Sequence, residues 1–449
     1  MERYHVLLSQ LGFDSCVAIA GKYVSVSGTP LTKEVIYPAL HTMMQTHAGL
    51  GMQIAAGVTR ADIPKYVRLP EVDLDAVVEF LEDSAADVDE LLRAQLGRPF
   101  ALGTSAPLWR VTVVNGATVV FAAHHAIADG QSGPALHATL LSALNDTATD
   151  QSKEFDRTVA VPQAIPLAEP TEAYMNISLS WSSIFHLLYQ LLVPKSWLPS
   201  ATAWTGNSIP PVPSLDMHVR CWSVSAAQTR EILRRCREHG TTLTAFLHTL
   251  LVGVLARVLA EERSEEASAC STVNVAVPVS LRRFTGVPPR GLCNHISTVY
   301  FFSPLRPVLV GGGDFSWEAT RAFGKELHGS VSRAPELLGK LRLLFRCGVA
   351  ESYFRGILGK RRASGMGLSN LGPFPVAKQE GEVSRWTISN VFFAQCDVVR
   401  GAAVKVNVVG SPEGTTNVAF TWGKASLDED LANTLIREVK TTLDAMLEP

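Results

Sequence analysis

Apolar and polar positions alternate along the first part of the chain in a way that predicts both helices and strands. The predicted elements are helices over 31–46 and 74–95 and strands over 109–114 and 117–124. Asn115-Gly116 separates the two strands and predicts a tight hairpin, because both positions of such a turn need a positive φ. The second strand therefore ends at His124, and Ser132 with Pro134 is typical of the start of a following helix.

The second half continues with the same mixture of patterns. The predicted elements are strands over 217–224, 271–279, 387–393, 403–409 and 418–422, and helices over 226–239, 242–261 and 427–447, with two more within 315–354. The stretch 150–214 differs, because it is rich in Pro, Ser and Thr and holds one apolar helix. This order of elements predicts an α/β (α+β) architecture in both halves, joined by a crossover.

Composition indicates a globular protein and argues against nucleic-acid binding and against a membrane protein. The chain has 449 residues, of which 47% are hydrophobic and 18% charged, as in a globular protein of two or three compact units. Lys and Arg number 40 against 42 Asp and Glu, so no basic excess indicates nucleic acid as a partner. The apolar runs 184–193 and 242–260 are short or interrupted by polar residues, so no transmembrane segment is expected.

The cysteines and the first residues indicate a cellular setting. Seven cysteines are scattered without a CxxC pair, which argues against a disulfide framework and against a zinc site. The opening residues Met1-Glu2-Arg3-Tyr4-His5 show no signal-peptide pattern. We therefore expect a reduced, cytoplasmic setting and no bound metal.

The segment His124-His125-Ala126-Ile127-Ala128-Asp129-Gly130 is the candidate catalytic motif. An HxxxD pair alone is a weak signal, but the preceding His and the following Gly make it far more specific. An imidazole is mostly neutral at pH 7 and can take the proton of a hydroxyl that attacks a carbonyl. For His125 this reading is favoured over a structural histidine, whereas for His124 the structural reading is favoured.

The neighbouring residues leave several roles open. No Gly-x-Ser-x-Gly elbow is present, which favours direct attack by the acceptor over a covalent acyl-enzyme. Asp129 fits either a local turn or an ion pair, and Gly130 either a close backbone approach or a positive φ. Cys293 and Cys396 are weaker candidates for a nucleophile, because no activating base is evident for either.

HHxxxDG after a strand resembles the signature of the CoA-dependent acyltransferase superfamily. This group includes chloramphenicol acetyltransferase, plant BAHD acyltransferases, peptide-synthetase condensation domains and fungal alcohol O-acetyltransferases. Further resemblances, in the same order along the chain, are found at 39–47, 107–111, 277–283 with Asn294, and 368–372. The chain lacks the DFGWG motif of the plant branch, which favours the fungal branch, and Cys293 stands where the family usually has Gly.

The resemblance implies a fold and a set of site residues. Two chloramphenicol-acetyltransferase-like lobes are expected, each a mainly antiparallel sheet flanked by helices, with a tunnel between them. His125 would be the general base, and Asp129 would pair with Arg282, or alternatively with Arg283. Ser369 and Asn370 would line the tunnel, where Ser369 would donate to the oxyanion; they, His124 and Gly130 complete the substrate candidates.

The expected lobes follow the chain. The N-terminal lobe is expected over 1–170, the crossover over 171–215 and the C-terminal lobe over 216–449, with a segment near 365–400 packing back on the N-terminal lobe. Lys360-Arg361-Arg362 is a candidate patch for the phosphates of CoA, although a solvated charged turn is the favoured reading.

The resemblance also implies an activity. The chain would be a monomeric O-acyltransferase that moves an acyl group, most simply acetyl, from acyl-CoA to the hydroxyl of a small alcohol or secondary metabolite. Acyl-CoA would be a co-substrate, with no permanently bound cofactor. Two alternatives stay open: a condensation-type enzyme that uses a carrier-bound acyl donor, and a non-catalytic acyl-CoA-binding protein of the same fold.

Overall fold

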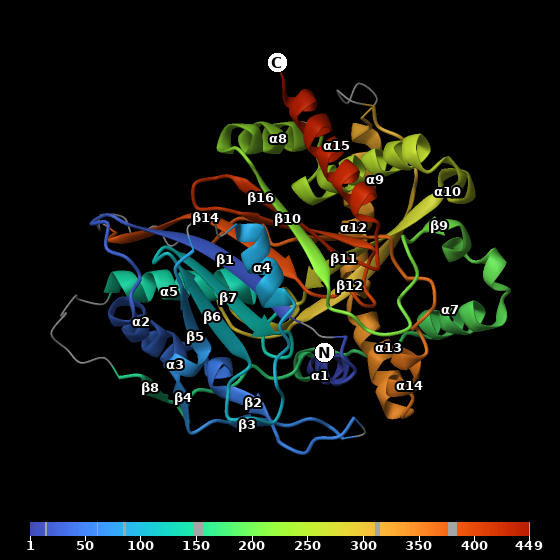
Figure 1. The fold of residues 1–449 in the computed structure, drawn as a ribbon. Coiled ribbons are helices and arrows are strands. Elements are labelled where there is room, and N and C mark those ends of the chain that lie inside the picture. Colours follow the sequence, from blue (N-terminus) through green and yellow to red (C-terminus); the bar gives the residue numbers. More distant parts are fainter. Residues whose placement is uncertain are drawn as a thin grey trace.

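The computed structural model describes residues 1–13, 16–60, 62–83, 87–146, 156–309, 315–375 and 384–448. Its main elements form two β-sheets with helices packed against them (Figure 1). The α-helices are α1 (Glu2–Gln10), α2 (Lys33–Thr46), α3 (Leu74–Val77), α4 (Val88–Leu96), α5 (Ser132–Asp146), α6 (Thr171–Tyr174), α7 (Trp181–Leu192), α8 (Ala226–Glu238), α9 (Leu243–Glu262), α10 (Ser264–Ala269), α11 (Arg282–Thr285), α12 (Trp317–Ser330), α13 (Pro335–Arg346), α14 (Ala350–Arg355) and α15 (Glu429–Leu447). The 3-10 helices are η1 (Ala48–Gly51), η2 (Lys195–Trp197), η3 (Pro199–Thr202) and η4 (Val331–Arg333).

The first sheet is built around the predicted hairpin. In spatial order its strands are β14 (Trp386–Gln395), β1 (Cys16–Ser25), β7 (Thr118–His124), β6 (Trp109–Val114) and β5 (Val78–Leu81). Asn115 and Gly116 have φ values of 50° and 58°, so the turn between β6 and β7 has the expected geometry. Neighbouring strands are antiparallel except β5 and β6, and α2 and α5 pack together beside the sheet.

The second sheet belongs to the second half of the chain. In spatial order its strands are β10 (Met217–Val224), β16 (Thr416–Gly423), β15 (Val404–Gly410), β13 (Met366–Asn370), β11 (Thr272–Ser280) and β12 (Ile296–Pro304), with β9 (Ala203–Trp204) also on β11. The pairs made by β13 are parallel, whereas the outer pairs are antiparallel. Two short pairs, β2 (Met52–Ile54) with β3 (Tyr66–Arg68) and β4 (Glu71–Asp73) with β8 (Thr158–Ala160), lie apart from both sheets.

Strand β14 connects the two halves of the molecule. It comes from the second half of the sequence but pairs antiparallel with β1, with Val17 opposite Gln395 and Ser25 opposite Trp386. Strand β13, nearby in sequence, stays in the second sheet. Residues 376–383, within the segment expected to pack back, lie outside the described residues. The lobe limits of 1–170, 171–215 and 216–449 stay predictions.

The single helix predicted over 74–95 is wrong. The described part of this stretch contains the short helix α3, then strand β5, and then α4, which begins at Val88. Val78 and Phe80 have the β-branched and aromatic side chains that favour strands, and β5 pairs in parallel with β6. The stretch has two separate helix starts, because Asp73 caps α3 and Asp87 caps α4. Residues 84–86 lie outside the described part.

Two helices need a further comment. The region 315–354 holds three α-helices, α12, α13 and α14, instead of the two predicted. Helix α9 is long and apolar enough to cross a membrane by length and composition. However, 78% of its most apolar 18-residue stretch is buried inside the protein. Its buried face includes Leu250, Val254 and Leu255, which belong to the core of the second sheet, so α9 is a core helix.

Candidate active site

His125 directly follows β7, a central strand, and so lies where the strands of the first sheet end. The loop that follows is held by Asp129, whose Oδ1 accepts hydrogen bonds from the backbone N–H of Ser132 at 3.0 Å and from its hydroxyl at 2.9 Å. The backbone N–H of Ile127 donates to the carbonyl of His124 at 3.0 Å. Asp129 thus fixes the shape of the loop that carries His125, and it is not among the described residues that line the chamber defined below.

A segment from the second half encloses this loop. Arg282 Nη2 donates to Asp129 Oδ1 at 2.7 Å, and the two side chains are only 7% and 2% exposed. Arg282 Nη1 also donates to the carbonyl of Gly291 at 2.6 Å. Arg283 is exposed and lies over the ring of Phe284, so Arg282 and not Arg283 forms the ion pair. The ion pair therefore links the motif loop to α11, which begins at Arg282 and leads into strand β12 of the second sheet.

The connection from α11 to β12 makes two further contacts with the motif loop. Asn294 Nδ2 donates to the carbonyl of His125 at 2.6 Å, and the backbone N–H of Asp129 donates to the carbonyl of Cys293 at 2.9 Å. Burial, with the negative charge of Asp129 adding to it, raises the pKa of the Cys293 thiol to about 12. Cys293 is therefore protonated at neutral pH, which excludes it as a thiolate nucleophile there.

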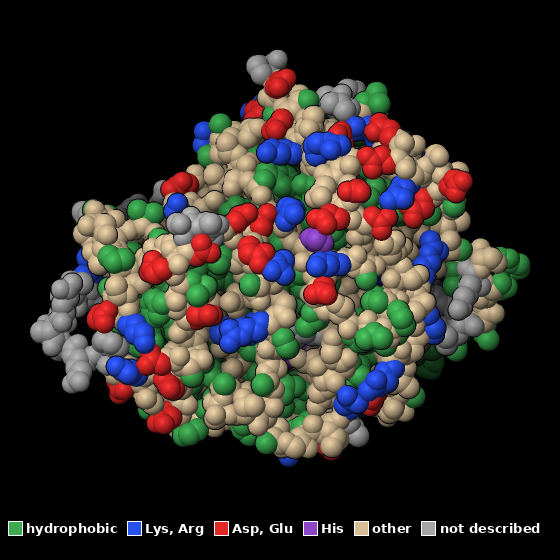
Figure 2. Space-filling model, in the orientation of Figure 1, with side chains coloured by type: hydrophobic (Ala, Val, Ile, Leu, Met, Phe, Trp, Pro, Cys, Tyr) green, Lys and Arg blue, Asp and Glu red, His purple; other side chains and the backbone are tan. Residues whose placement is uncertain are grey.

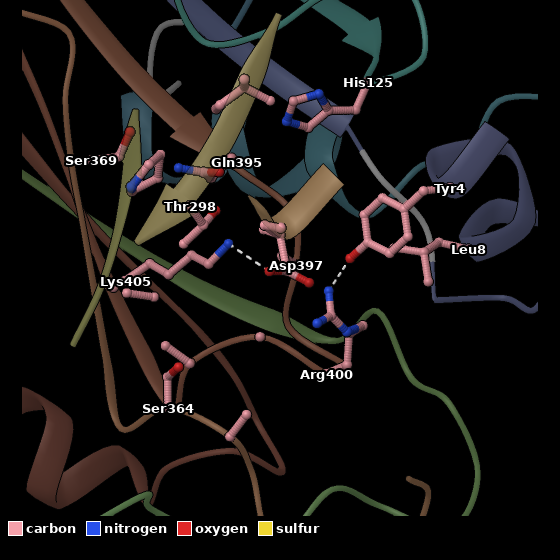
Figure 3. Close-up of a pocket in the computed structure, with 18 of the residues that line it drawn as sticks. Tyr4, Leu8, His125, Thr298, Ser364, Ser369, Gln395, Asp397, Arg400 and Lys405 are labelled. Carbon is pink, nitrogen blue, oxygen red and sulfur yellow. Dashed lines mark hydrogen bonds and ion pairs between the residues drawn. The ribbon is translucent and has the colours of Figure 1, made fainter. Parts of the chain in front are cut away.

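His125 is a buried, neutral base that faces an open chamber. Its side chain points into that space, and the residue is 7% exposed (Figure 3). Burial lowers its pKa below the ordinary 6.5, while the charge of Asp129 and the residue's own carbonyl partly oppose the shift. The ring stacks on His5 of α1 with 4.1 Å between centroids and 11° between planes. Burial likewise holds the pKa of His5 well below 6.5, with His125 adding to this, so both rings are neutral at pH 7.

The chamber lies between the end of the first sheet and one face of the second. It encloses about 1020 Å³ of empty space, including its mouth, and is lined by α1, β11, β12, β13, β15, α13 and the turn after β14. Alternation along β12 explains the geometry, because Val299 and Phe301 pack into the core while Thr298 and Tyr300 face the chamber. The lining residues come from both halves of the chain, so the chamber is formed where the two halves meet.

The remaining predicted substrate residues divide into two groups. Ser369 of β13 lines the chamber. Asn370 does not line it: its amide donates to Thr244 Oγ1 at 3.1 Å, and its Oδ1 accepts from the backbone N–H of Gly372 at 2.9 Å, so it holds the strand end.

His124 and Gly130 also lie away from the chamber. His124 is fully buried, its Nδ1 accepts from the N–H of Ala126 at 3.0 Å, and burial lowers its pKa to about 3. It is a core residue and not a substrate ligand. A Cβ at Gly130 would meet Leu371 at 2.9 Å and Phe393 at 3.1 Å, so this glycine serves a close approach rather than a positive φ.

Sequence reasoning missed several chamber residues. Tyr4 and His5 come from α1. Asp397 and Arg400 come from the turn after β14, and Lys405 comes from β15 (Figure 3). A signal was present for Lys405, because it interrupts the buried valines of the predicted strand at 403–409. For His5 and Asp397 no local pattern marks the residue, since each reaches the chamber only through the packing of distant segments.

In the basic run Lys360-Arg361-Arg362, both arginines are held by loop carbonyls. Arg362 is buried and donates to the carbonyls of Asn207 and Val399, while Arg361 donates to those of Ser200 and Ala201. The two guanidinium groups satisfy loop carbonyls, and Lys360 and Arg361 are exposed, so the favoured solvated turn fits these two residues but not the buried Arg362.

In the described residues, neither the surface charge on the visible face nor the metal-ligating side chains identify a further part of the site. On the face shown in Figure 2, Lys and Arg side chains are interspersed with Asp and Glu and form no basic stripe. In the described part of the chain, no group of three or more His, Cys, Asp or Glu residues is arranged to hold a metal ion.

Solved structures with the same fold include enzymes that transfer acyl groups. The TRI3 trichothecene 15-O-acetyltransferase from Fusarium sporotrichioides matches with a TM-score of 0.71 and 12% identity, over 99% of this chain and 93% of that one. VibH, a condensation enzyme of nonribosomal peptide synthesis, matches with a TM-score of 0.57 and 13% identity, over 99% and 93%. At these identities the likeness establishes the fold, which is the expected two-lobed acyltransferase and condensation-domain fold.

Sequence relatives and a family model are more specific. A probable alcohol acetyltransferase of Aspergillus fumigatus, crmB, is 26% identical over 96% of this chain and 95% of its own length. A probable alcohol acetyltransferase of Fusarium pseudograminearum, FCK4, is 27% identical over 82% and 77%. The model of the alcohol acetyltransferase family matches residues 1–441. The chain belongs to the alcohol acetyltransferase family and is an acyltransferase.

Proposed function

We propose that this enzyme transfers an acyl group, acetyl in the simplest case, from acyl-CoA to a hydroxyl group of a small alcohol or secondary metabolite. The observation that carries the proposal is the neutral imidazole of His125, which points into a chamber lined by both halves of the chain. Acyl-CoA acts as a co-substrate and not as a bound cofactor. We also propose that the enzyme is cytoplasmic and monomeric, in keeping with its scattered cysteines.

In the proposed mechanism His125 accepts the hydroxyl proton as the acceptor oxygen attacks the thioester carbonyl. The new C–O bond gives a tetrahedral oxyanion, toward which Ser369 donates a hydrogen bond. Collapse of this intermediate breaks the C–S bond, and His125 returns the proton to the CoA thiolate. Both substrates are bound together and no acyl-enzyme forms. Asp129 and Arg282 act at a distance from the reacting atoms, by holding the loop that carries His125.

The acid limb of the rate profile follows from the environment of His125. The base must be neutral, and burial lowers its pKa below 6.5. A lowered pKa keeps the neutral form present as the pH falls through 6.5, so kcat/KM stays level there and declines only at more acidic pH. The measurement is kcat/KM against pH with folding followed by circular dichroism. An acid inflection above pH 6.5 in the folded enzyme would contradict this environment for the base.

Thiol release from acyl-CoA tests the proposed function. A panel of acyl-CoAs is incubated with and without a mixed pool of alcohols, and free CoA thiol and ester product are both quantified. We expect thiol release that depends on alcohol and is matched by ester formed. Turnover only with an acyl group on a carrier protein would establish a condensation-type donor instead. Binding of acyl-CoA without turnover across the acceptor panel would indicate a non-catalytic protein.

A further inference from the structure

A charged cluster shares the chamber with His125. Lys405 Nζ donates to Asp397 Oδ2 at 2.8 Å, and a guanidinium nitrogen of Arg400 donates to the Tyr4 hydroxyl. Figure 3 shows Asp397 between Lys405 on one side and the Arg400–Tyr4 pair on the other, with His125 across the same space. We call Asp397, Arg400 and Lys405 the charged cluster.

The surrounding backbone leaves room for this cluster. A Cβ at Gly401 would lie 2.6 Å from Asp397 Oδ2 and 2.1 Å from the Asp397 carbonyl oxygen, so a side chain there would displace the carboxylate. A Cβ at Gly367 would meet Cγ of Lys405 at 3.0 Å. Glycines thus lie beside the side chains of Asp397 and Lys405, where a larger residue would collide with them. Such close packing is typical of a binding site and not of a solvated surface.

The cluster carries an excess of one positive charge. Asp397 supplies one carboxylate against the two cations Arg400 and Lys405, and Lys405 with Arg400 outweighs burial to lower the pKa of Asp397. Burial raises the pKa of Tyr4, so its phenol is neutral and adds no charge. The His125 and His5 imidazoles are neutral for the reasons given above, and the Met1 amine pairs with Glu2 at 3.1 Å.

The two cations also retain hydrogen-bonding capacity. An ammonium has three donors and a guanidinium five. The carboxylate of Asp397 takes one donor of Lys405, and the hydroxyls of Tyr4 and Tyr300 each take a donor of Arg400. This excess charge is partly withdrawn from water, because the Lys405 side chain is 14% exposed, and such a charge is costly unless it is compensated. An anionic group in the chamber would supply that compensation.

We propose that the charged cluster is a specificity site for an acceptor that bears a carboxylate, so that the preferred acceptors are hydroxy acids. The proposal rests on the proposed function for the identity of the reacting hydroxyl. The acceptor is favoured over CoA as the source of the anion, because the pantetheine arm separates the phosphates of CoA from the thioester that must meet His125. Asp397, Arg400 and Lys405 line the same chamber as His125, which places the cluster near the reacting centre.

Matched acceptors test the proposal. 3-Hydroxydecanoate and 3-hydroxy-3-phenylpropanoate are each compared with their methyl esters, with the full-length enzyme and one fixed acyl-CoA. The acid of at least one pair is expected to have a KM at least about tenfold lower than its ester, as one charge-assisted hydrogen bond supplies. A second arm uses an N-acetylcysteamine thioester as donor. This donor lacks phosphates, so a persisting preference assigns the anion to the acceptor, and its loss would overturn that assignment.

Two variants must shift the preference in opposite directions. Lys405→Met leaves one cation against Asp397, so the acid-to-ester ratio of affinities falls to about one. Asp397→Asn raises the positive excess, so the ratio increases. Lys405→Arg keeps the charge and retains the preference, and Lys424→Met, an exposed lysine outside the chamber, is the matched control. Thermal unfolding identifies any variant that does not fold.

Binding without turnover separates this proposal from the proposed function. Calorimetric titration of the wild-type protein with each acid and ester, without donor, measures acceptor affinity even where no acyl transfer occurs. Tighter binding of an acid that is lost in Lys405→Met supports the anion site whatever the reaction. Equal affinity for acid and ester in both pairs, or a preference unchanged in Lys405→Met, would overturn it.

Discussion

Replacing Arg282 by Met is expected to lower the free energy of unfolding by about 3–5 kcal/mol, the usual effect of removing one partner of a buried ion pair. The variant leaves the Asp129 carboxylate in a site where it is 2% exposed, with only hydrogen bonds from Ser132 and the backbone for compensation. It also removes the donor to the carbonyl of Gly291. Denaturant unfolding followed by circular dichroism gives the change directly.

The neighbouring arginine provides a matched control for this prediction. Arg283→Met changes the same residue type one position along, but Arg283 is exposed and packs on Phe284, so its loss is expected to cost less than about 1 kcal/mol. The double variant Arg282→Met with Asp129→Asn is expected to recover part of the loss, because no uncompensated charge remains buried. Equal destabilisation by Arg282→Met and Arg283→Met would show that the ion pair does not hold the motif loop.

Local patterns were sufficient for many of the longer elements, but they predicted no strand at β1, β12 or β13. The hairpin at Asn115-Gly116 has its signal in two adjacent residues, and α9 and β11 have theirs in long, mainly apolar or β-branched runs. The stretch 74–95 failed because α3, β5 and α4 follow one another within a few residues. At that length helical and strand spacings overlap, and pairing with β6 decides the outcome.

Only some of the site residues could be predicted from the sequence. The pairing of Asp129 with Arg282 entered through resemblance to a family, since the two residues lie 153 positions apart. The stacking of His5 on His125 and the position of Asp397 depend on where α1 and the turn after β14 pack, which no local pattern encodes. Asn370 follows the chamber residue Ser369, but alternation along β13 turns its side chain away toward Thr244.

Replacing His125 by Ala is expected to lower kcat/KM for acyl transfer by about 10²–10⁴-fold, the contribution of a positioned general base. The imidazole points into the chamber, and its lowered pKa leaves it unprotonated at pH 7 and able to take the hydroxyl proton. His125→Asn keeps a similar volume and is expected to lose activity to the same degree without an added cavity. His328→Ala, which removes an exposed histidine at the end of α12, serves as the control and retains activity.

The most direct test of the account is alcohol-stimulated thiol release, measured side by side for the wild type, His125→Ala and His328→Ala under one set of conditions. The account predicts stimulation by alcohol in the wild type and in His328→Ala, and its loss in a His125→Ala protein that unfolds at a similar temperature. Alcohol-stimulated release at an unaltered rate in folded His125→Ala would contradict the assignment of His125 as the base.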